Sequence, residues 1–308
     1  MADLNTRFQA LLPPAERKLP ETNKEANGYT TATPVSDGRF VYVTYGSGMV
    51  GCYAMDGTRQ WLHFFPEDTH RTYGGGNASS PVLVGNMLIT HFLDMVALDA
   101  QTGKELWRVP HGHNWGTPAI VMLGKLTLLV TDGGEVVNAA DGKTMATVMT
   151  VVYNSAVAKD DVVYCADRDK AQAYRLTVDK QGQVTSTTLW ETKLGLSRYY
   201  ASPLLAGGYL YLVNSAGALD VLEAATGKVA YARRLPLGGA TYSSPVLAGN
   251  VVIVSSDTGK AVVLKSGPTY EEVTHFTFEP SRATPACAGA RMYIRTCSKE
   301  SKLYCIGE

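Results

Sequence analysis

The residues of this sequence best suited to chemistry lie just before a recurring Ser/Thr-Pro phrase. Tyr and Trp combine a large apolar area with a polar tip and lose little entropy on binding. Arg binds carboxylates through two parallel hydrogen bonds. We therefore predict a ligand-binding set of Tyr73, Asn77, His113, Asn114, Trp115, Arg198, Tyr199, Tyr242 and Arg282. The alternative is that these side chains fill the interior of the fold and bond to the neighbouring backbone.

No catalytic residue is predicted. The serines beside the prolines return with each phrase, so their first explanation is structural, and the chain has no Gly-x-Ser-x-Gly nucleophile motif. The run Gly74-Gly75-Gly76 is not followed by Gly-Lys-Ser/Thr, which a phosphate-binding loop requires. These patterns favour a binding protein over an enzyme, although they leave the question of activity open.

Metal binding is not predicted either. His111 and His113 flank a glycine and could face the same side of an extended segment, but no third ligand can be identified. The five cysteines form no CxxC motif, and an odd number leaves at least one thiol free. Cys297 and Cys305 could approach each other in the last hairpin, although small buried apolar residues are the favoured interpretation.

Composition excludes several classes of protein. The 308 residues include 28 basic and 28 acidic side chains, and a net charge of zero argues against nucleic-acid binding. No run of 18 apolar residues exists, so no transmembrane segment is predicted. The first seven residues lack the basic and apolar regions of a secretory signal. Either the protein is cytoplasmic, or a signal peptide was removed before the position numbered 1.

A repeat runs through the whole chain. Hydroxylated residues, a proline, an apolar pair and a turn return at intervals of 37 to 47 residues. The copies are centred on Pro34, Pro81, Pro118, Ala156, Pro203, Pro245 and Pro285, with alanine in place of proline in the fourth. Repeats of this period are typical of blades that bury their faces against one another.

Each repeat contains four short strands. Asp-Gly or Thr-Gly pairs such as Thr102-Gly103 suit the hairpin turns, because glycine accepts a positive φ. A large aromatic residue follows the turn, and we predict that it packs between neighbouring blades. These blade-docking residues are Trp61, Trp107, Trp190 and Tyr231.

The fold predicted from these features is an all-β propeller of four-stranded antiparallel blades, with seven repeats. An eight-bladed ring that lacks one blade is the alternative. Residues 29–308 form a single propeller domain, and residues 1–28 form an N-terminal extension. The last repeat stops after its third strand, so we expect a segment near residues 7–12 to supply the outer strand and close the ring.

Two segments carry a resemblance to a known family. Ser79-Ser80-Pro81-Val82-Leu83 and the run from Ala97 to Trp107 resemble the pyrroloquinoline-quinone-like repeat of bacterial quinoprotein-like propellers. That repeat occurs in quinoprotein dehydrogenases and in a scaffold of the outer-membrane assembly machinery. The resemblance implies an exported protein of the periplasm or cell envelope, which the N-terminal residues do not test.

The resemblance leaves two functions to compare. The leading one is a non-enzymatic scaffold that binds another protein or a small ligand on one face of the propeller. The alternative is a pyrroloquinoline-quinone-dependent oxidoreductase for alcohols or sugars, with calcium and a site at the channel mouth near His113, Trp115 and Arg198. The resembled dehydrogenases hold the quinone against a disulfide of adjacent cysteines, and this chain has no adjacent cysteines. Carbohydrate binding by the same aromatic residues is a third possibility.

Overall fold

The computed structural model describes residues 31–46, 48–65, 78–92, 94–112, 115–297 and 301–307. These residues form strands and turns without a helix, so the described part has no helix that is long and apolar enough to cross a membrane. The chain is an all-β, seven-bladed propeller of antiparallel sheets, which confirms the predicted fold class. Backbone contacts divide it into two compact units, residues 1–114 and residues 115–308.

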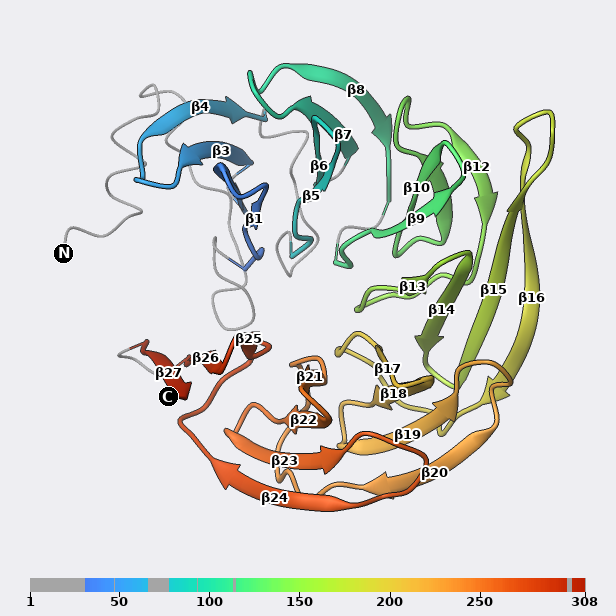
Figure 1. The fold of residues 1–308 in the computed structure, drawn as a ribbon, viewed down its shortest axis with the longest axis vertical. Helices are drawn as coiled ribbons and strands as arrows, with labels where there is room; N and C mark the ends of the chain where they lie inside the picture. The colour runs from blue at the N-terminus through green and yellow to red at the C-terminus, as the bar shows by residue number, and fades with distance from the viewer. Residues whose placement is uncertain are drawn as a thin grey trace. The chain divides into compact units, whose positions relative to one another are not determined.

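The N-terminal unit contains two four-stranded blades (Figure 1). Blade 1 consists of β1 (Val35–Ser36), β2 (Phe40–Tyr45), β3 (Met49–Ala54) and β4 (Arg59–Phe64). Blade 2 consists of β5 (Val82–Val84), β6 (Met87–His91), β7 (Asp94–Asp99) and β8 (Glu105–Pro110). The first strands of both blades, β1 and β5, contact each other.

The C-terminal unit contains five blades. Blade 3 consists of β9 (Ala119–Leu123), β10 (Leu126–Val130), β11 (Glu135–Asn138) and β12 (Thr144–Thr147), and blade 4 of β13 (Val157–Lys159), β14 (Val162–Asp167), β15 (Lys170–Val178) and β16 (Val184–Lys193). Blade 5 consists of β17 (Leu204–Ala206), β18 (Tyr209–Val213), β19 (Ala218–Glu223) and β20 (Val229–Arg234). Blade 6 consists of β21 (Val246–Ala248), β22 (Val251–Ser255), β23 (Lys260–Lys265) and β24 (Glu272–Thr277), and blade 7 of β25 (Ala286–Ala288), β26 (Arg291–Arg295) and β27 (Leu303–Gly307).

Blade 7 has three strands among the described residues, where the other six blades have four. Its third strand, β27, carries exposed apolar side chains at Leu303 and Ile306. Residues 7–12, which we expect to supply the missing outer strand, lie outside the described residues. The closing strand therefore stays a prediction from the sequence.

The second and third strands of blades 1 to 6 form the core. Most of their apolar side chains are buried or partly buried, because the sheets pack against one another. Between blades 5 and 6, for example, Val213 and Val221 pack in one cluster with Val252, Val254 and Leu264. The first strands are shorter and line the inner side of the unit, where β9 contacts β13 and β17 contacts β21.

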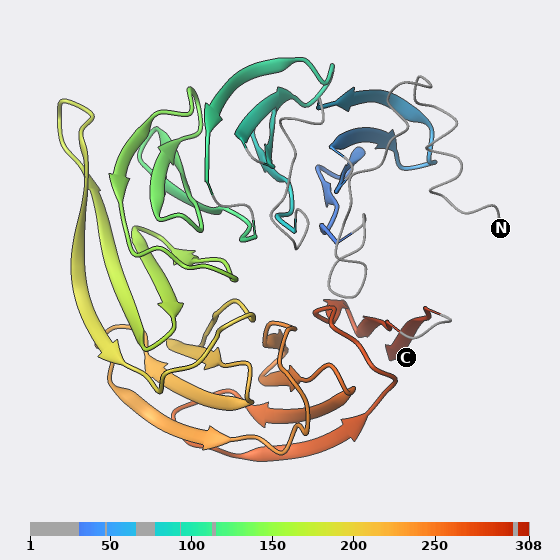
Figure 2. The same cartoon turned by 180° about the vertical axis from the view of Figure 1, so that it is seen from behind.

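The hairpin of β15 and β16 in blade 4 extends further than the others, with strands of 9 and 10 residues (Figure 2). It covers the short strand β12 of blade 3. The Ser186 hydroxyl donates a hydrogen bond to the Thr147 carbonyl oxygen at 2.6 Å, and Val184 is buried in the core shared by the two blades.

Two tryptophan side chains join successive blades in the same way. Trp61 on β4 donates from Nε1 to the carbonyl oxygen of Ala100 in blade 2, at 2.9 Å. Trp190 on β16 donates from Nε1 to the carbonyl oxygen of Ala224 in blade 5, also at 2.9 Å. Both residues are 9% exposed, so each indole combines a large apolar contact with a satisfied polar group.

The two other aromatic residues assigned to blade docking are less buried. Tyr231 on β20 packs edge-on against Tyr270 of blade 6, with ring centroids 6.0 Å apart. Burial raises the pKa of the Tyr231 phenol. Trp107 lies on β8, the outer strand of blade 2, and is partly exposed.

The Thr-Gly turns receive the tryptophan rings. Gly103 and Gly227 both have a φ of +71°, a left-handed conformation that favours glycine. A Cβ atom at Gly103 would lie 2.6 Å from the Trp61 ring, and one at Gly227 would lie 2.6 Å from the Trp190 ring. Both the backbone angle and the docking contact therefore require glycine at these turns.

The five cysteines are free, and they divide into two groups. Cys52 and Cys165 are buried, and burial raises the pKa of their thiols to about 11 and about 12. Cys287, Cys297 and Cys305 are exposed. The expectation of small buried residues thus applies to two of the five.

We expect a thiol reagent such as Ellman's reagent to modify the three exposed cysteines quickly in the native protein. Cys52 and Cys165 should react only after unfolding, because the reactive thiolate is suppressed and shielded. In a Cys165→Ser variant the native count should be unchanged and the unfolded count should fall by one. Fewer than three fast thiols would contradict this result and would indicate a disulfide between Cys297 and Cys305.

Candidate functional site

Five of the nine predicted ligand-binding residues lie in the described part of the chain. Trp115, Arg198, Tyr199, Tyr242 and Arg282 all belong to the C-terminal unit. Tyr73, Asn77, His113 and Asn114 lie outside the described residues. The described part of the predicted site therefore lies in the C-terminal unit.

One side chain from each of the five blades contributes to a row that we call the aromatic strip. It consists of Trp115, Tyr153, Tyr200, Tyr242 and Arg282, and each lies two residues before the Ser or Thr that precedes Pro or Ala in its phrase. The ring centroids of Trp115 and Tyr153 are 6.1 Å apart, those of Tyr153 and Tyr200 are 5.4 Å apart, and those of Tyr200 and Tyr242 are 4.8 Å apart. The Arg282 guanidinium carbon lies 4.7 Å from the Tyr242 centroid. The strip is thus continuous across the unit.

Hydrogen bonds between successive phrases set the spacing of the strip. The Ser155 N–H donates to the Ser202 hydroxyl at 3.0 Å, and the Ser202 N–H donates to the Ser244 hydroxyl at 3.0 Å. The same bond joins Thr117 to Ser155 and Ser244 to Thr284, and Thr33 to Ser80 in the N-terminal unit. This bond explains why each phrase has a hydroxyl residue before the proline. The copy with alanine at 156 keeps its serine and its bond.

Buried polar residues next to the strip orient its side chains. The Asn154 amide donates to the carbonyl oxygens of Ala166 and Tyr199, at 3.1 and 3.0 Å. The Ser243 hydroxyl donates to the Ser255 carbonyl oxygen at 2.9 Å. Tyr153 and Tyr242 directly precede these buried anchors in the sequence, and both are at least partly exposed.

The neighbouring residues Tyr199 and Tyr200 differ in burial. Tyr199 is 1% exposed, and burial raises the pKa of its phenol, so this predicted binding residue belongs to the core. Tyr200 joins the strip in its place, and Tyr153 also belongs to it. Reasoning from the sequence missed both residues. Their position two residues before each Ser or Thr was the signal that could have found them.

Two exposed arginines lie at the strip: Arg282, which belongs to it, and Arg198, which contacts Tyr200. Arg198 donates from one guanidinium nitrogen to the Tyr200 hydroxyl at 3.3 Å, and this bond raises the pKa of the guanidinium. Arg198 and Arg282 are exposed, Tyr153 is 37% exposed, and the other rings of the strip are partly exposed. The surface therefore offers ring edges, hydroxyl groups and two fixed positive charges.

A cavity of about 210 Å³ lies between the segment leading into blade 4 and the turn after β14. The first of these segments directly precedes Tyr153 in the sequence. The cavity is lined by Met149, Thr150, Val152, Asp167, Arg168, Asp169 and Lys170. Burial raises the pKa of Asp167. The Arg168 carbonyl oxygen accepts a hydrogen bond from the Ser197 N–H at 3.1 Å, which connects this turn to the segment that carries Arg198.

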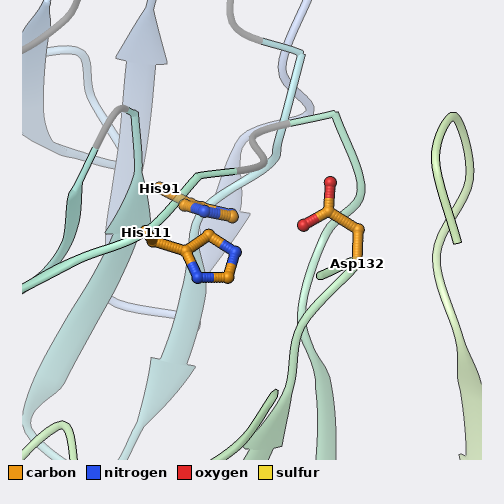
Figure 3. A group of neighbouring side chains, drawn as sticks. All are labelled: His91, His111 and Asp132. Carbon is orange, nitrogen blue, oxygen red and sulfur yellow. The ribbon is translucent and has the colours of Figure 1, made fainter. Parts of the chain in front are cut away.

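A pair of histidines lies in the N-terminal unit. The rings of His91 and His111 have centroids 4.2 Å apart, and Figure 3 shows them one above the other. Asp132, also drawn there, belongs to blade 3, where its carboxylate accepts hydrogen bonds from the N–H groups of Trp115 and Gly116 at 3.0 and 2.9 Å. Imidazole nitrogens are among the ligands that zinc uses, and the pair supplies two of them.

The half-buried carboxylate of Asp220 on β19 makes stability depend on pH. Burial raises the pKa of Asp220, so the folded state binds this proton more tightly than the unfolded state. The contribution of Asp220 to stability therefore falls as the pH rises through the range between its ordinary and its raised pKa.

We expect Asp220→Asn to raise the melting temperature at pH 7 by roughly 2 °C and to leave it almost unchanged at pH 3. Calorimetric melting curves at both pH values measure this difference. The exposed carboxylate of Asp179, replaced in the same way, is the control for general charge effects. An equal gain from Asp220→Asn at both pH values would contradict the assignment.

Comparison with known proteins places this chain. A profile of the family described as outer membrane protein assembly factor BamB matches residues 16–184 and 94–306, which together span most of the chain. The chain belongs to this family. Family membership confirms the resemblance that the repeat suggested.

Solved structures show the same fold. BamB from Moraxella catarrhalis is 13% identical, covers 86% of this chain and 80% of its own, and superposes with a TM-score of 0.68. The computationally designed protein Ika8 is 9% identical, covers 94% of this chain and 100% of its own, and superposes with a TM-score of 0.51. No curated protein matches in sequence.

Proposed function

We propose that this chain is a non-enzymatic propeller that binds a partner protein through the aromatic strip. The observation that carries the proposal is that five successive blades each place a side chain in one continuous, partly exposed row. Tyr, Trp and Arg are the residues that contribute most to protein–protein contacts. Membership of a family described by an assembly factor supports a scaffold over an enzyme.

The location that fits this function is the cell envelope. The related structure is that of BamB, and the family description names outer-membrane protein assembly. By this likeness the partner is a protein of the outer-membrane assembly process. A net charge of zero is consistent with a protein partner and gives no basis for attraction to nucleic acid.

Site-specific photocrosslinking in intact cells tests the proposal. Tyr153 is replaced with p-benzoylphenylalanine in one strain, and Leu189 on β16 in another. The two positions are matched because their exposed fractions are 37% and 40% and both lie in the C-terminal unit. Irradiation should produce a discrete protein adduct from position 153 that position 189 lacks. No adduct, or the same adducts from both positions, would contradict binding through the strip.

Calorimetric titration with pyrroloquinoline quinone, with and without calcium, tests the enzymatic alternative. We expect no binding heat in either condition. Calcium-dependent binding in the micromolar range or tighter would instead make the chain a quinone-dependent oxidoreductase. Replacing Trp115 and Arg198 in that event would show whether the strip holds the quinone.

A further inference from the structure

One ring of the aromatic strip, that of Tyr242, has both faces covered by other members of the strip. Tyr200 and Tyr242 are stacked, with an angle of 17° between their planes and centroids 4.8 Å apart. The Arg282 guanidinium also lies over the Tyr242 ring, at 4.7 Å. Two groups cannot occupy one face of a ring at these distances, so Tyr242 lies between Tyr200 and Arg282. Ligands that bind by stacking, such as sugars and nucleobases, need an open face that Tyr242 does not offer.

The strip presents hydrogen-bond donors and positive charge instead. The edge of an aromatic ring carries partial positive charge, and phenol hydroxyls and guanidinium groups are donors. Arg198 is exposed, and within the part of the chain that the structure describes it forms no ion pair with a carboxylate; its contact is with the Tyr200 hydroxyl. Carboxylates, which bind guanidinium through paired hydrogen bonds, complement such a surface.

The spacing of the strip is somewhat shorter than the repeat of an extended polypeptide. Its successive rings are 6.1, 5.4 and 4.8 Å apart. In an extended chain every second side chain points to the same side, at a repeat of roughly 6.6 Å. An extended segment lying along the strip would therefore place side chains near successive blades without keeping register with every ring.

We propose that the aromatic strip binds an extended, acidic polypeptide segment of the partner, whose carboxylates pair with Arg198 and Arg282. This inference rests on the proposed function and names the chemistry of the partner. Arg198 bonds to the hydroxyl of Tyr200 and Arg282 lies over the ring of Tyr242, so an acidic segment lying along the stacked pair would meet one arginine at each ring.

Fluorescence anisotropy with labelled synthetic peptides tests the inference. The probe is a dodecapeptide that alternates glutamate and threonine, and the comparison peptides carry glutamine or lysine in place of glutamate. The glutamate peptide should bind at least tenfold more tightly than either comparison peptide, because only its carboxylates pair with the arginines. The measurement is made at about 50 mM salt, because salt weakens exposed charge pairs. The affinity of the glutamate peptide should fall as the salt concentration rises.

Matched double variants locate the binding site. Arg198→Gln with Arg282→Gln should weaken the glutamate peptide by roughly tenfold or more, since each exposed charge pair contributes a few-fold. The control is Arg233→Gln with Arg234→Gln on β20, which removes the same charge from the same unit. The control pair also contains an arginine that stacks on a tyrosine, because the Arg233 guanidinium lies 5.3 Å from the centroid of the Tyr270 ring. The control variant should bind within about twofold of the unaltered protein.

Four results would overturn the inference. Two concern the peptides: no binding of the glutamate peptide at 1 mM protein, or equal binding of the glutamine peptide. The other two are equal weakening of binding by both double variants, and displacement of the glutamate peptide by citrate at the same concentration as by unlabelled peptide. The last would identify a site for small carboxylates. The photocrosslinking result separates the two levels. An adduct at position 153 with any of these four results would leave protein binding intact and reject only the acidic partner.

Discussion

Replacing Trp190 with alanine is expected to lower the free energy of unfolding by about 3 to 5 kcal/mol. The variant loses a buried indole from the core between blades 4 and 5, where Trp190 packs with Tyr164 and Leu222. It also leaves the Ala224 carbonyl oxygen without the indole N–H that lies 2.9 Å away. Neighbouring blades stabilise one another, so a weakened interface lowers the stability of the whole unit.

Urea denaturation followed by circular dichroism measures this loss. Trp115→Ala is the control, because it removes the same side chain from the partly exposed strip and should cost less than half as much. Equal losses in the two variants, or a loss below about 1 kcal/mol for Trp190→Ala, would show that the indole does not join the blades.

Replacing Gly227 with alanine should cost about 3 kcal/mol, which is unusual for the addition of one methyl group. Part of the cost, about 1 kcal/mol, comes from the left-handed backbone at a φ of +71°. The larger part comes from the Trp190 ring, which would lie 2.6 Å from the new Cβ and must move. Movement of the ring breaks the contact that joins blades 4 and 5.

A second glycine and a double-mutant cycle separate the two contributions. Gly249 has a φ of +60°, and no atom lies within 4 Å of a Cβ built there, so Gly249→Ala should cost only the backbone part. In the Trp190→Ala background the extra cost of Gly227→Ala should fall, because the ring is no longer present, although the Thr192 hydroxyl, at 2.8 Å, remains close to the new Cβ. If Gly227→Ala costs the same in both backgrounds, the contact between turn and ring has no energetic role.

Much of the fold was predictable because the repeat is both local and periodic. A hydroxyl residue, a turn and an apolar run recur in every repeat of about 40 residues. A single four-stranded sheet leaves both of its faces exposed, so it must pack against copies of itself. Seven copies therefore indicated seven blades. The sequence assigned Trp61 and Trp190 to blade docking. In the structure each indole N–H donates a hydrogen bond to a carbonyl oxygen of the next blade.

The candidate site was predictable only in part, because its geometry depends on which loop residues are buried and which meet the next blade. The sequence favoured Tyr199 over Tyr200, two neighbours of the same type. Tyr199 is 1% exposed and belongs to the core, whereas Tyr200 is partly exposed and contacts Tyr153 and Tyr242. Tyr153 precedes the copy that lacks proline, so its place in the row was visible only once Ser155 was seen to keep the bond between phrases.

The sequence by itself determined the fold class, the seven repeats and the resemblance to the family, because repeat period, turn chemistry and apolar runs act over short distances. The tertiary structure decided that the repeats form seven blades, which aromatic residues form the strip, and that both faces of Tyr242 are covered by its neighbours. Those properties arise between residues 38 to 47 positions apart, such as Trp115 and Tyr153 or Tyr153 and Tyr200. Only the packing of successive blades brings such residues within 4.8 to 6.1 Å of each other.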